Sequence, residues 1–71
     1  MERKPVNSSN IKSVGYDEST GTLQIEFVSG AVWNYENIEK WMYESLISSL
    51  SVGKYFSANI RGKFNEIKIN G

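Results

Sequence analysis

The sequence predicts an α+β fold: a three-stranded antiparallel β-meander followed by two α-helices packed on one sheet face, with a short C-terminal strand or tail. Residues 22–28, TLQIEFV, alternate apolar and polar side chains as a half-buried strand does. Polar segments ending in glycine, DESTG and SG, flank that strand. Beyond residue 37, apolar residues recur at four-residue steps, which is typical of an amphipathic helix. A chain of 71 residues accommodates one domain.

The first hairpin is expected to join NIKSVGY, residues 10–16, to TLQIEFV through the DESTG loop. Asp17 can accept backbone N–H bonds, and Gly21 can adopt a positive φ. A loop closed by Asp17 and Thr22 pairs Tyr16 with Leu23. The sheet face that receives the helices would then carry these apolar side chains: Val14, Tyr16, Leu23, Ile25, Phe27 and Val32. Before this hairpin, residues 1–5 are expected to be a flexible lead-in.

The second hairpin decides where Trp33 and Tyr35 point. A two-residue turn at Ser29 and Gly30 is favoured, because such turns are the commonest and glycine suits the second position. Trp33 would then lie opposite Glu26, so both aromatic rings would point away from the helices. A three-residue loop, Val28 to Gly30, is the alternative, and it reverses the parity because side chains alternate along a strand.

Two helices are expected after the third strand. Asn37 can cap the first helix, whose apolar stripe consists of Ile38, Met42, Leu46 and Leu50. Ser51 can cap the second, whose apolar side consists of Val52, Phe56 and Ile60, and Gly62 suits the residue just past its end. Residues 6–64 form the expected domain. Residues 65–71 are a C-terminal extension that forms a short strand or a tail.

The composition argues against an enzyme. The chain has no cysteine and no histidine, so it lacks disulfides, the commonest zinc ligand and the commonest general base. No motif predicts a cofactor or a metal, and we expect none. No apolar run approaches the roughly 20 residues that a membrane helix needs. The N-terminus lacks the apolar stretch of a secretory signal, so we expect a cytoplasmic protein with no membrane partner.

The net charge is zero but unevenly distributed. Residues 1–50 contain four basic and seven acidic residues, whereas residues 51–71 contain four basic residues and one acidic residue. A neutral chain is a poor non-specific ligand for nucleic acid. The basic final third can still form a local patch, although such lysines are often merely solvated.

The sequence resembles the KTSC domain family, from about Val6 to Phe64. The most specific segments are SS-x-I-x-x-VGYD at residues 8–17 and S-x-G-x-YF-x-x-x-IR at residues 51–61. The central Tyr-x-Tyr motif of the family maps onto Trp33 and Tyr35, with tryptophan replacing the first tyrosine. Glu39 stands where the family often has proline. The family is named for its occurrence at the C-terminus of some lysyl-tRNA synthetases, and it also occurs as free-standing small bacterial proteins.

This resemblance implies no established activity, although RNA binding has been suggested for the family because of its association with a synthetase. We expect a small non-enzymatic binding module with RNA as the favoured ligand. Trp33 and Tyr35 would stack on bases, while Lys54, Arg61 and Lys63 would contact phosphates. Arg61 alternatively caps a helix end or pairs with a carboxylate such as Asp17. A protein–protein or homodimeric assembly module that uses the aromatic sheet face is the competing hypothesis.

Overall fold

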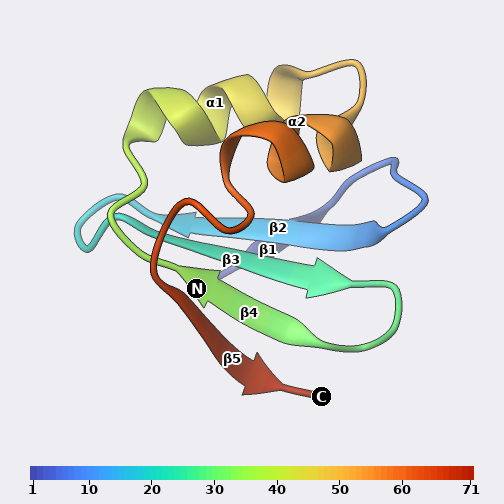
Figure 1. Cartoon of the computed structure of the whole chain (residues 1–71), viewed down its shortest axis with the longest axis horizontal. Helices are drawn as coiled ribbons and strands as arrows, with labels where there is room; N and C mark the ends of the chain where they lie inside the picture. The colour runs from blue at the N-terminus through green and yellow to red at the C-terminus, as the bar shows by residue number, and fades with distance from the viewer.

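A computed structural model describes all residues, 1–71, and consists of two helices that cover one face of a five-stranded antiparallel sheet (Figure 1). The strand order follows the chain, β1-β2-β3-β4-β5. The predicted α+β class is confirmed, with two more strands than the predicted meander. The elements are β1 Arg3–Pro5, β2 Ile11–Asp17, β3 Thr22–Phe27, β4 Val32–Tyr35, α1 Lys40–Ser48, α2 Val52–Asn59 and β5 Glu66–Asn70.

The hairpin between β2 and β3 has the predicted register. Tyr16 pairs with Leu23, and Asp17 pairs with Thr22. Asp17 Oδ1 accepts bonds from the Ser19 N–H at 3.0 Å and the Ser19 hydroxyl at 2.6 Å. Gly21 closes the loop with a φ of 69°. Local turn chemistry therefore determines this register, as the sequence predicts.

The hairpin between β3 and β4 contradicts the favoured register. Its loop contains three residues, because the Phe27 N–H donates to the Ala31 carbonyl at 2.9 Å and the Gly30 N–H donates to the Phe27 carbonyl at 2.9 Å. Gly30 has a φ of 100°, the positive φ that such a loop requires. Trp33 consequently pairs with Ile25 rather than Glu26. The prediction that the aromatic pair faces away from the helices is wrong.

The same change of parity moves Val32. It pairs with Glu26 and lies on the sheet face opposite the helices, rather than on the helix-covered face as predicted. In the pairing of β2 with β3, a register shift between Ile11 and Ser13 brings Ile11 onto the helix-covered face, where its side chain is buried. The core on this face therefore gains Ile11 and Tyr35.

Helix α1 begins later than predicted. Asn37 has a φ of 62°, and Glu39 is the N-cap residue without a side-chain cap bond. The Ile38 N–H donates to the Gly21 carbonyl at 2.9 Å, and the Ile38 carbonyl accepts from the Tyr16 hydroxyl at 2.6 Å. These bonds hold Ile38 to the end of β2 and to the β2–β3 loop, so the helix starts only after Ile38.

The predicted apolar faces of both helices are largely confirmed. Ile38, Met42 and Leu46 are buried, but Leu50 is fully exposed because α1 ends at Ser48. In α2 the buried residues are Val52 and Phe56, and Ile60 is buried at its C-cap. Ser51 caps α2 as predicted, by accepting a bond from the Lys54 N–H at 3.4 Å, and Gly62 has a φ of 75°.

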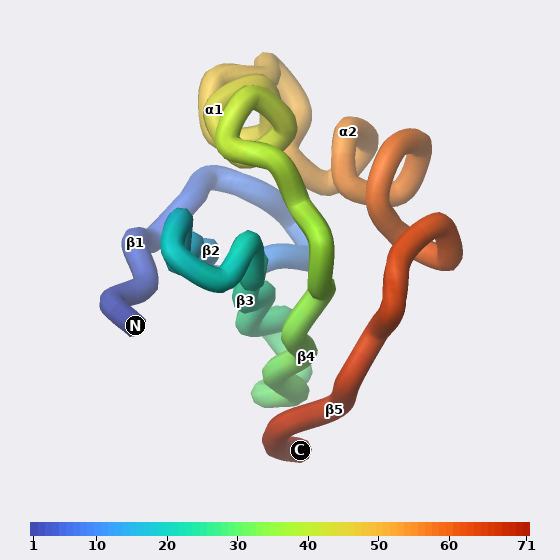
Figure 2. Tube along the Cα trace, turned by 90° about the vertical axis from the view of Figure 1, so that its left-hand side faces the viewer, coloured from blue at the N-terminus to red at the C-terminus, as the bar shows by residue number.

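Both ends of the chain belong to the sheet. Residues 3–5, within the expected lead-in, pair with β2, and residues 66–70 pair with β4. Figure 2 shows β1 and β5 at opposite edges of the curved sheet, with both helices above it. Strand β5 follows the helices in the chain and pairs with β4, and this pairing places part of the basic C-terminal segment beside β4.

Candidate nucleic-acid interface

A groove of about 510 Å³ lies between α2 and the strand ends near the β3–β4 loop. Its α2 side presents Gly53, Ser57 and Arg61, which are four residues apart and so follow one face of the helix and its end. The strand side includes Trp33 and Glu66. The full lining comprises Asn10, Ile11, Phe27, Val28, Ser29, Ala31, Trp33, Tyr35, Gly53, Phe56, Ser57, Arg61 and Glu66.

The floor of the groove is an aromatic cluster centred on Phe56. The Phe56 ring meets Phe27 edge-on at a centroid distance of 5.7 Å and Tyr35 edge-on at 5.2 Å. Edge-to-face contacts of this kind add to the stabilisation from burial. The floor is therefore apolar, and it is continuous with the core.

Tyr35 belongs to this floor and does not form a stacking surface. Its side chain is only 3% exposed, so no base can lie against its ring. Burial raises the pKa of its hydroxyl to about 12, with the charge of Glu66 adding to the rise and the charge of Arg61 opposing it. The hydroxyl has no hydrogen-bond partner within the protein. The pKa of Tyr35 thus depends on the charges of Glu66 and Arg61 at this end of the groove.

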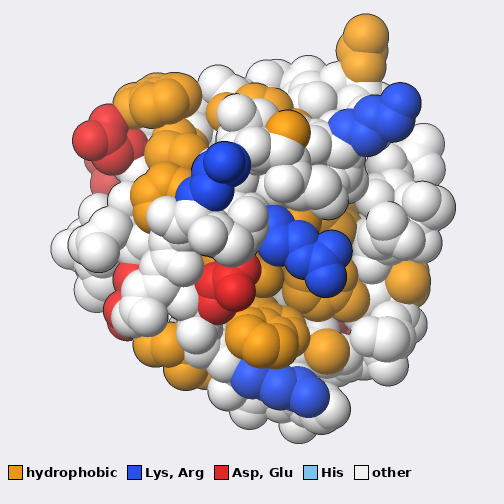
Figure 3. Space-filling view, viewed as in Figure 1, with side chains coloured by type: hydrophobic (Ala, Val, Ile, Leu, Met, Phe, Trp, Pro, Cys, Tyr) orange, Lys and Arg blue, Asp and Glu red, His pale blue; other side chains and the backbone are white.

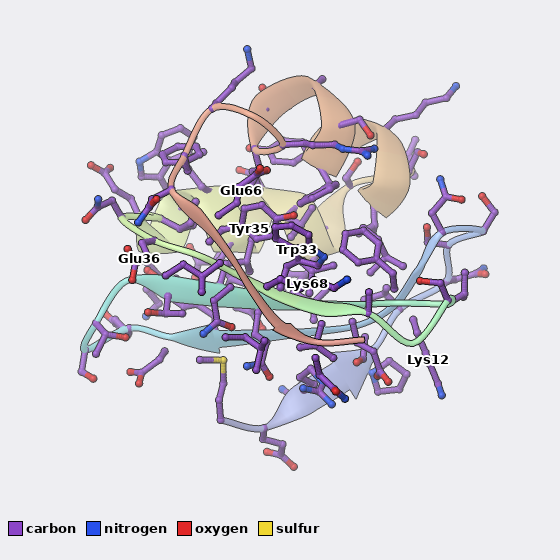
Figure 4. All side chains as sticks on the ribbon, turned by 60° about the horizontal axis from the view of Figure 1, so that its bottom comes forward. Lys12, Trp33, Tyr35, Glu36, Glu66 and Lys68 are labelled. Carbon is purple, nitrogen blue, oxygen red and sulfur yellow. The ribbon has the colours of Figure 1, made fainter.

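Trp33 remains accessible at the edge of the groove. It is half-buried, packs against the core and makes no hydrogen bond through its indole N–H. Lys68 of β5 pairs directly with Trp33, so both side chains lie on the same sheet face. Figure 4 shows Lys68 beside Trp33 where β5 runs along β4.

The sequence alone does not indicate Lys68 as a site residue. The alternation of Glu66, Ile67 and Lys68 was the available signal, but its meaning depends on knowing that the segment is a strand paired with β4. With that pairing, Lys68 lies on the helix-covered side with Trp33, and Ile67 lies on the opposite side with Asn34.

Arg61 lines the groove without an ionic partner. The two ion pairs of the chain are Arg3–Glu26 and Lys40–Glu18, so the alternative pairing of Arg61 with Asp17 is absent. Glu66 also lines the groove, but its Oε1 already accepts a bond from the Gly62 N–H at 2.9 Å. The guanidinium group of Arg61 is therefore available to an external acceptor.

The remaining predicted phosphate contacts lie elsewhere. Lys54 borders an adjoining hollow with Ser8 and Ser51, and Lys63 is exposed outside both hollows. Figure 3 shows hydrophobic side chains below the helices with basic side chains around them and acidic ones beside them. The structure thus brings together Trp33, Arg61 and Lys68.

No group of three or more acidic, cysteine or histidine side chains is placed to hold a metal ion. Neither helix is long and apolar enough to cross a membrane.

The KTSC domain family model matches residues 7–64. The chain belongs to the KTSC domain family. A crystal structure of a KTSC domain protein from Yersinia pestis superposes with a TM-score of 0.94 at 35% identity, covering 97% of both chains. An uncharacterised protein of Stutzerimonas stutzeri is 35% identical over 57 residues, which is 80% of each chain. A lysine–tRNA ligase of Nostoc punctiforme is 41% identical over 56 residues, which is 79% of this chain and 10% of the ligase.

The two most specific segments of this KTSC domain meet in space. Ser8 Oγ accepts bonds from the N–H groups of Asn10 at 3.2 Å and Ile11 at 3.3 Å. An added Cβ at Gly53 would lie only 3.2 Å from that oxygen, so glycine lets α2 approach the β1–β2 loop. This contact fixes the far end of the groove and gives a structural reason for Ser8 and Gly53.

Proposed function

We propose that this KTSC domain is a small non-enzymatic module that binds single-stranded RNA in the groove. One observation carries the proposal: the half-buried Trp33 lies beside Lys68 and lines a groove that also presents Arg61. The indole N–H, the ammonium group and the guanidinium group of these residues have no hydrogen-bond or ionic partner in the protein. An aromatic face with nearby unpaired cations is the combination that single-stranded nucleic acid requires.

The residues divide the work between stacking and charge. One base would lie against the indole of Trp33, a contact worth about 1–3 kcal/mol. Arg61 would donate two parallel bonds to a phosphate, and Lys68 would act as a point charge on a neighbouring phosphate. Ser57 and Asn10, farther along the groove, supply groups that can bond a ribose hydroxyl or a base edge.

A single strand suits this surface better than a duplex. The groove is concave and its aromatic ring is at the edge, so the base must be unstacked to reach it. The similarity to a segment of lysine–tRNA ligases supports an RNA ligand, because those relatives act on tRNA according to their name. Lys54, in the adjoining hollow, would extend the phosphate track, whereas Lys63 would contribute only long-range attraction.

The test is a fluorescence-anisotropy titration of labelled single-stranded RNA and of tRNA at about 50 and about 200 mM salt. We expect binding that weakens with salt, and we expect Trp33→Ala to weaken it about tenfold at the lower salt concentration, within the range for loss of one stacked base. Trp41→Ala is the matched control, because Trp41 is exposed on α1 outside the groove.

Three outcomes would contradict the proposal. They are no binding at the lower salt concentration, equal effects of the two tryptophan substitutions, and unchanged binding by a variant that carries both Trp33→Ala and Arg61→Ala. Circular dichroism of each variant verifies that it is folded.

A further inference from the structure

The free edge of β5 is the longest unpaired backbone edge of the sheet. All five residues of β5 are exposed, including Ile67 at 42% and Ile69 at 52%. The opposite edge, β1, has three residues and ends in Pro5, which cannot donate a backbone bond. An edge strand with exposed apolar side chains is a template for pairing with another strand.

The direction of the backbone groups along β5 follows from one bond. The Glu36 N–H donates to the Asn65 carbonyl at 3.1 Å, so Asn65 turns its backbone toward β4. Pairing with β4 is regular from Glu66 to Lys68, and the extra residue Ile69 interrupts it only beyond Lys68. Because alternate residues of a regular antiparallel strand turn their N–H and C=O to opposite sides, Ile67 also turns inward, and Glu66 and Lys68 turn outward. The open edge therefore offers the N–H and C=O groups of Glu66 and Lys68.

We propose that a second copy of this chain pairs with this edge, antiparallel, with the twofold axis passing between the two Ile67 residues. In that register Glu66 of one copy lies opposite Lys68 of the other, and each such pair exchanges two backbone hydrogen bonds. The two Ile67 side chains meet as a closely spaced pair on the face opposite the helices. The edge is thus self-complementary in charge, in backbone donors and in apolar contact.

Neighbouring symmetric registers lack this complementarity. Centring the axis on Lys68 places two lysines opposite each other, and centring it on Glu66 places two glutamates opposite each other. Like charges directly across an antiparallel pair are destabilising. Charge therefore selects the register centred on Ile67.

The proposed dimer does not depend on RNA binding, but it arranges the grooves, and because it places Glu66 of the second copy opposite Lys68, dimerisation and RNA compete for the Lys68 side chain. A twofold axis through an antiparallel strand pair is perpendicular to the sheet, so the helices of both copies cover the same face of one ten-stranded sheet. The two Trp33 side chains would lie on the same side of that sheet, one on each side of the axis.

The test is sedimentation velocity of the full chain without RNA, up to about 1 mM protein, because a single strand pair is a small interface of the weak class. We expect a reversible monomer–dimer equilibrium. Glu66→Lys and Lys68→Glu should each weaken self-association about tenfold, since each change places like charges across both pairs. Lys12→Glu is the control for a change of net charge, because Lys12 lies on β2, which β3 and β4 separate from this edge.

Mixing the two variants gives the decisive measurement. Glu66→Lys protein presents two lysines and Lys68→Glu protein presents two glutamates, so the mixture should form a heterodimer although each alone is mainly monomeric. Lys68→Pro, which removes an outward donor only, should also abolish pairing. A wild-type chain that stays monomeric at the highest concentration, or a mixture with no heterodimer, would overturn the proposal.

Discussion

The chain contains two arginines, and the surroundings of Arg3 and Arg61 differ in a way that reveals the site. Arg3 lies on the sheet face opposite the helices, where its neighbours Gln24 and Glu26 are hydrogen-bonded. Arg61 lies in the groove on the helix-covered side, where its guanidinium has none. A structural arginine thus has its hydrogen-bonding groups paired within the protein, whereas an arginine available to a ligand does not, although both are exposed or half-exposed.

The environment of Arg3 is a hydrogen-bonded chain across four strands. Arg3 donates to Gln24 Oε1 at 2.5 Å and approaches Glu26 Oε1 at 3.8 Å. Glu26 also accepts from the Ser13 hydroxyl at 2.7 Å, and Gln24 donates to Asn34 Oδ1 at 3.0 Å. The face that was expected to carry the aromatic pair is instead covered by this polar network.

The first prediction concerns stability at alkaline pH, which depends on Tyr35 and on the nearby Arg61 in the groove. Tyr35 has a pKa of about 12 in the folded chain against about 10 when unfolded, so its contribution to stability is complete below about pH 10. It is lost as the pH rises through 12, because the unfolded chain releases the proton first. The free energy of unfolding, measured by urea titration, should therefore fall by up to about 2 kcal/mol between about pH 9 and 12 because of this residue.

Tyr35→Phe is the control for that measurement. It should leave stability at neutral pH nearly unchanged, because the hydroxyl has no hydrogen bond, and it should flatten the alkaline decline. Arg61→Ala should steepen the decline, because the positive charge of Arg61 lowers the pKa of Tyr35. A decline of equal slope in the wild type and in Tyr35→Phe would contradict this assignment.

The second prediction compares the two arginines in RNA binding. Arg61→Ala should weaken binding to single-stranded RNA about tenfold at low salt and reduce the slope of log K against log salt by about 0.7, as expected for the loss of one phosphate contact. Arg3→Ala should change neither quantity. The measurement is the salt series described above, repeated for both variants, and equal slopes for the two variants would remove the distinction between the arginines.

The third prediction compares them in stability. Arg3→Ala should lower the free energy of unfolding by about 1 kcal/mol, because Gln24 loses a donor and Glu26 loses a nearby charge. Lys4→Ala, in the same strand and without an ion pair, should have a smaller effect, and Arg61→Ala should have almost none. Urea midpoints for the three variants provide the measurement, and a larger loss for Arg61→Ala than for Arg3→Ala would reverse our interpretation.

Local chemistry made some elements predictable. The loop from Asp17 to Gly21 fixes its own hydrogen bonds, so the β2–β3 register follows from the sequence. Ser51 and Gly62 mark the ends of the second helical segment for the same reason. The similarity to KTSC domains was also visible in the printed sequence, through the segments around Ser8 and Gly53.

The register of the β3–β4 hairpin was not predictable from its turn residues. Ser29 and Gly30 fit a two-residue turn as well as the end of a three-residue loop. The two alternatives differ in whether Tyr35 reaches Phe56, and that contact is made by a helix much later in the chain. Tertiary packing therefore decides the parity, and with it the composition of the groove.

Edge strands were the other element that the sequence left undetermined. Arg3–Pro5 is too short for a periodic pattern, and Glu66–Asn70 has weak alternation. Each becomes a strand because a neighbour offers its backbone groups. Lys68 was missed as a site residue for this reason, since its position beside Trp33 exists only in the paired sheet.

The strand order has a practical consequence for experiments on this domain. Met1 lies near Gly15, at the β1 edge, whereas an added Cβ at Gly71 would lie 2.6 Å from the Cα of Ala31, a groove residue. A purification tag or fused protein placed ahead of Met1 would therefore leave the groove and the β5 edge unobstructed. The same addition after Gly71 would emerge beside both, so the choice of terminus determines whether a recombinant version retains its proposed binding surfaces.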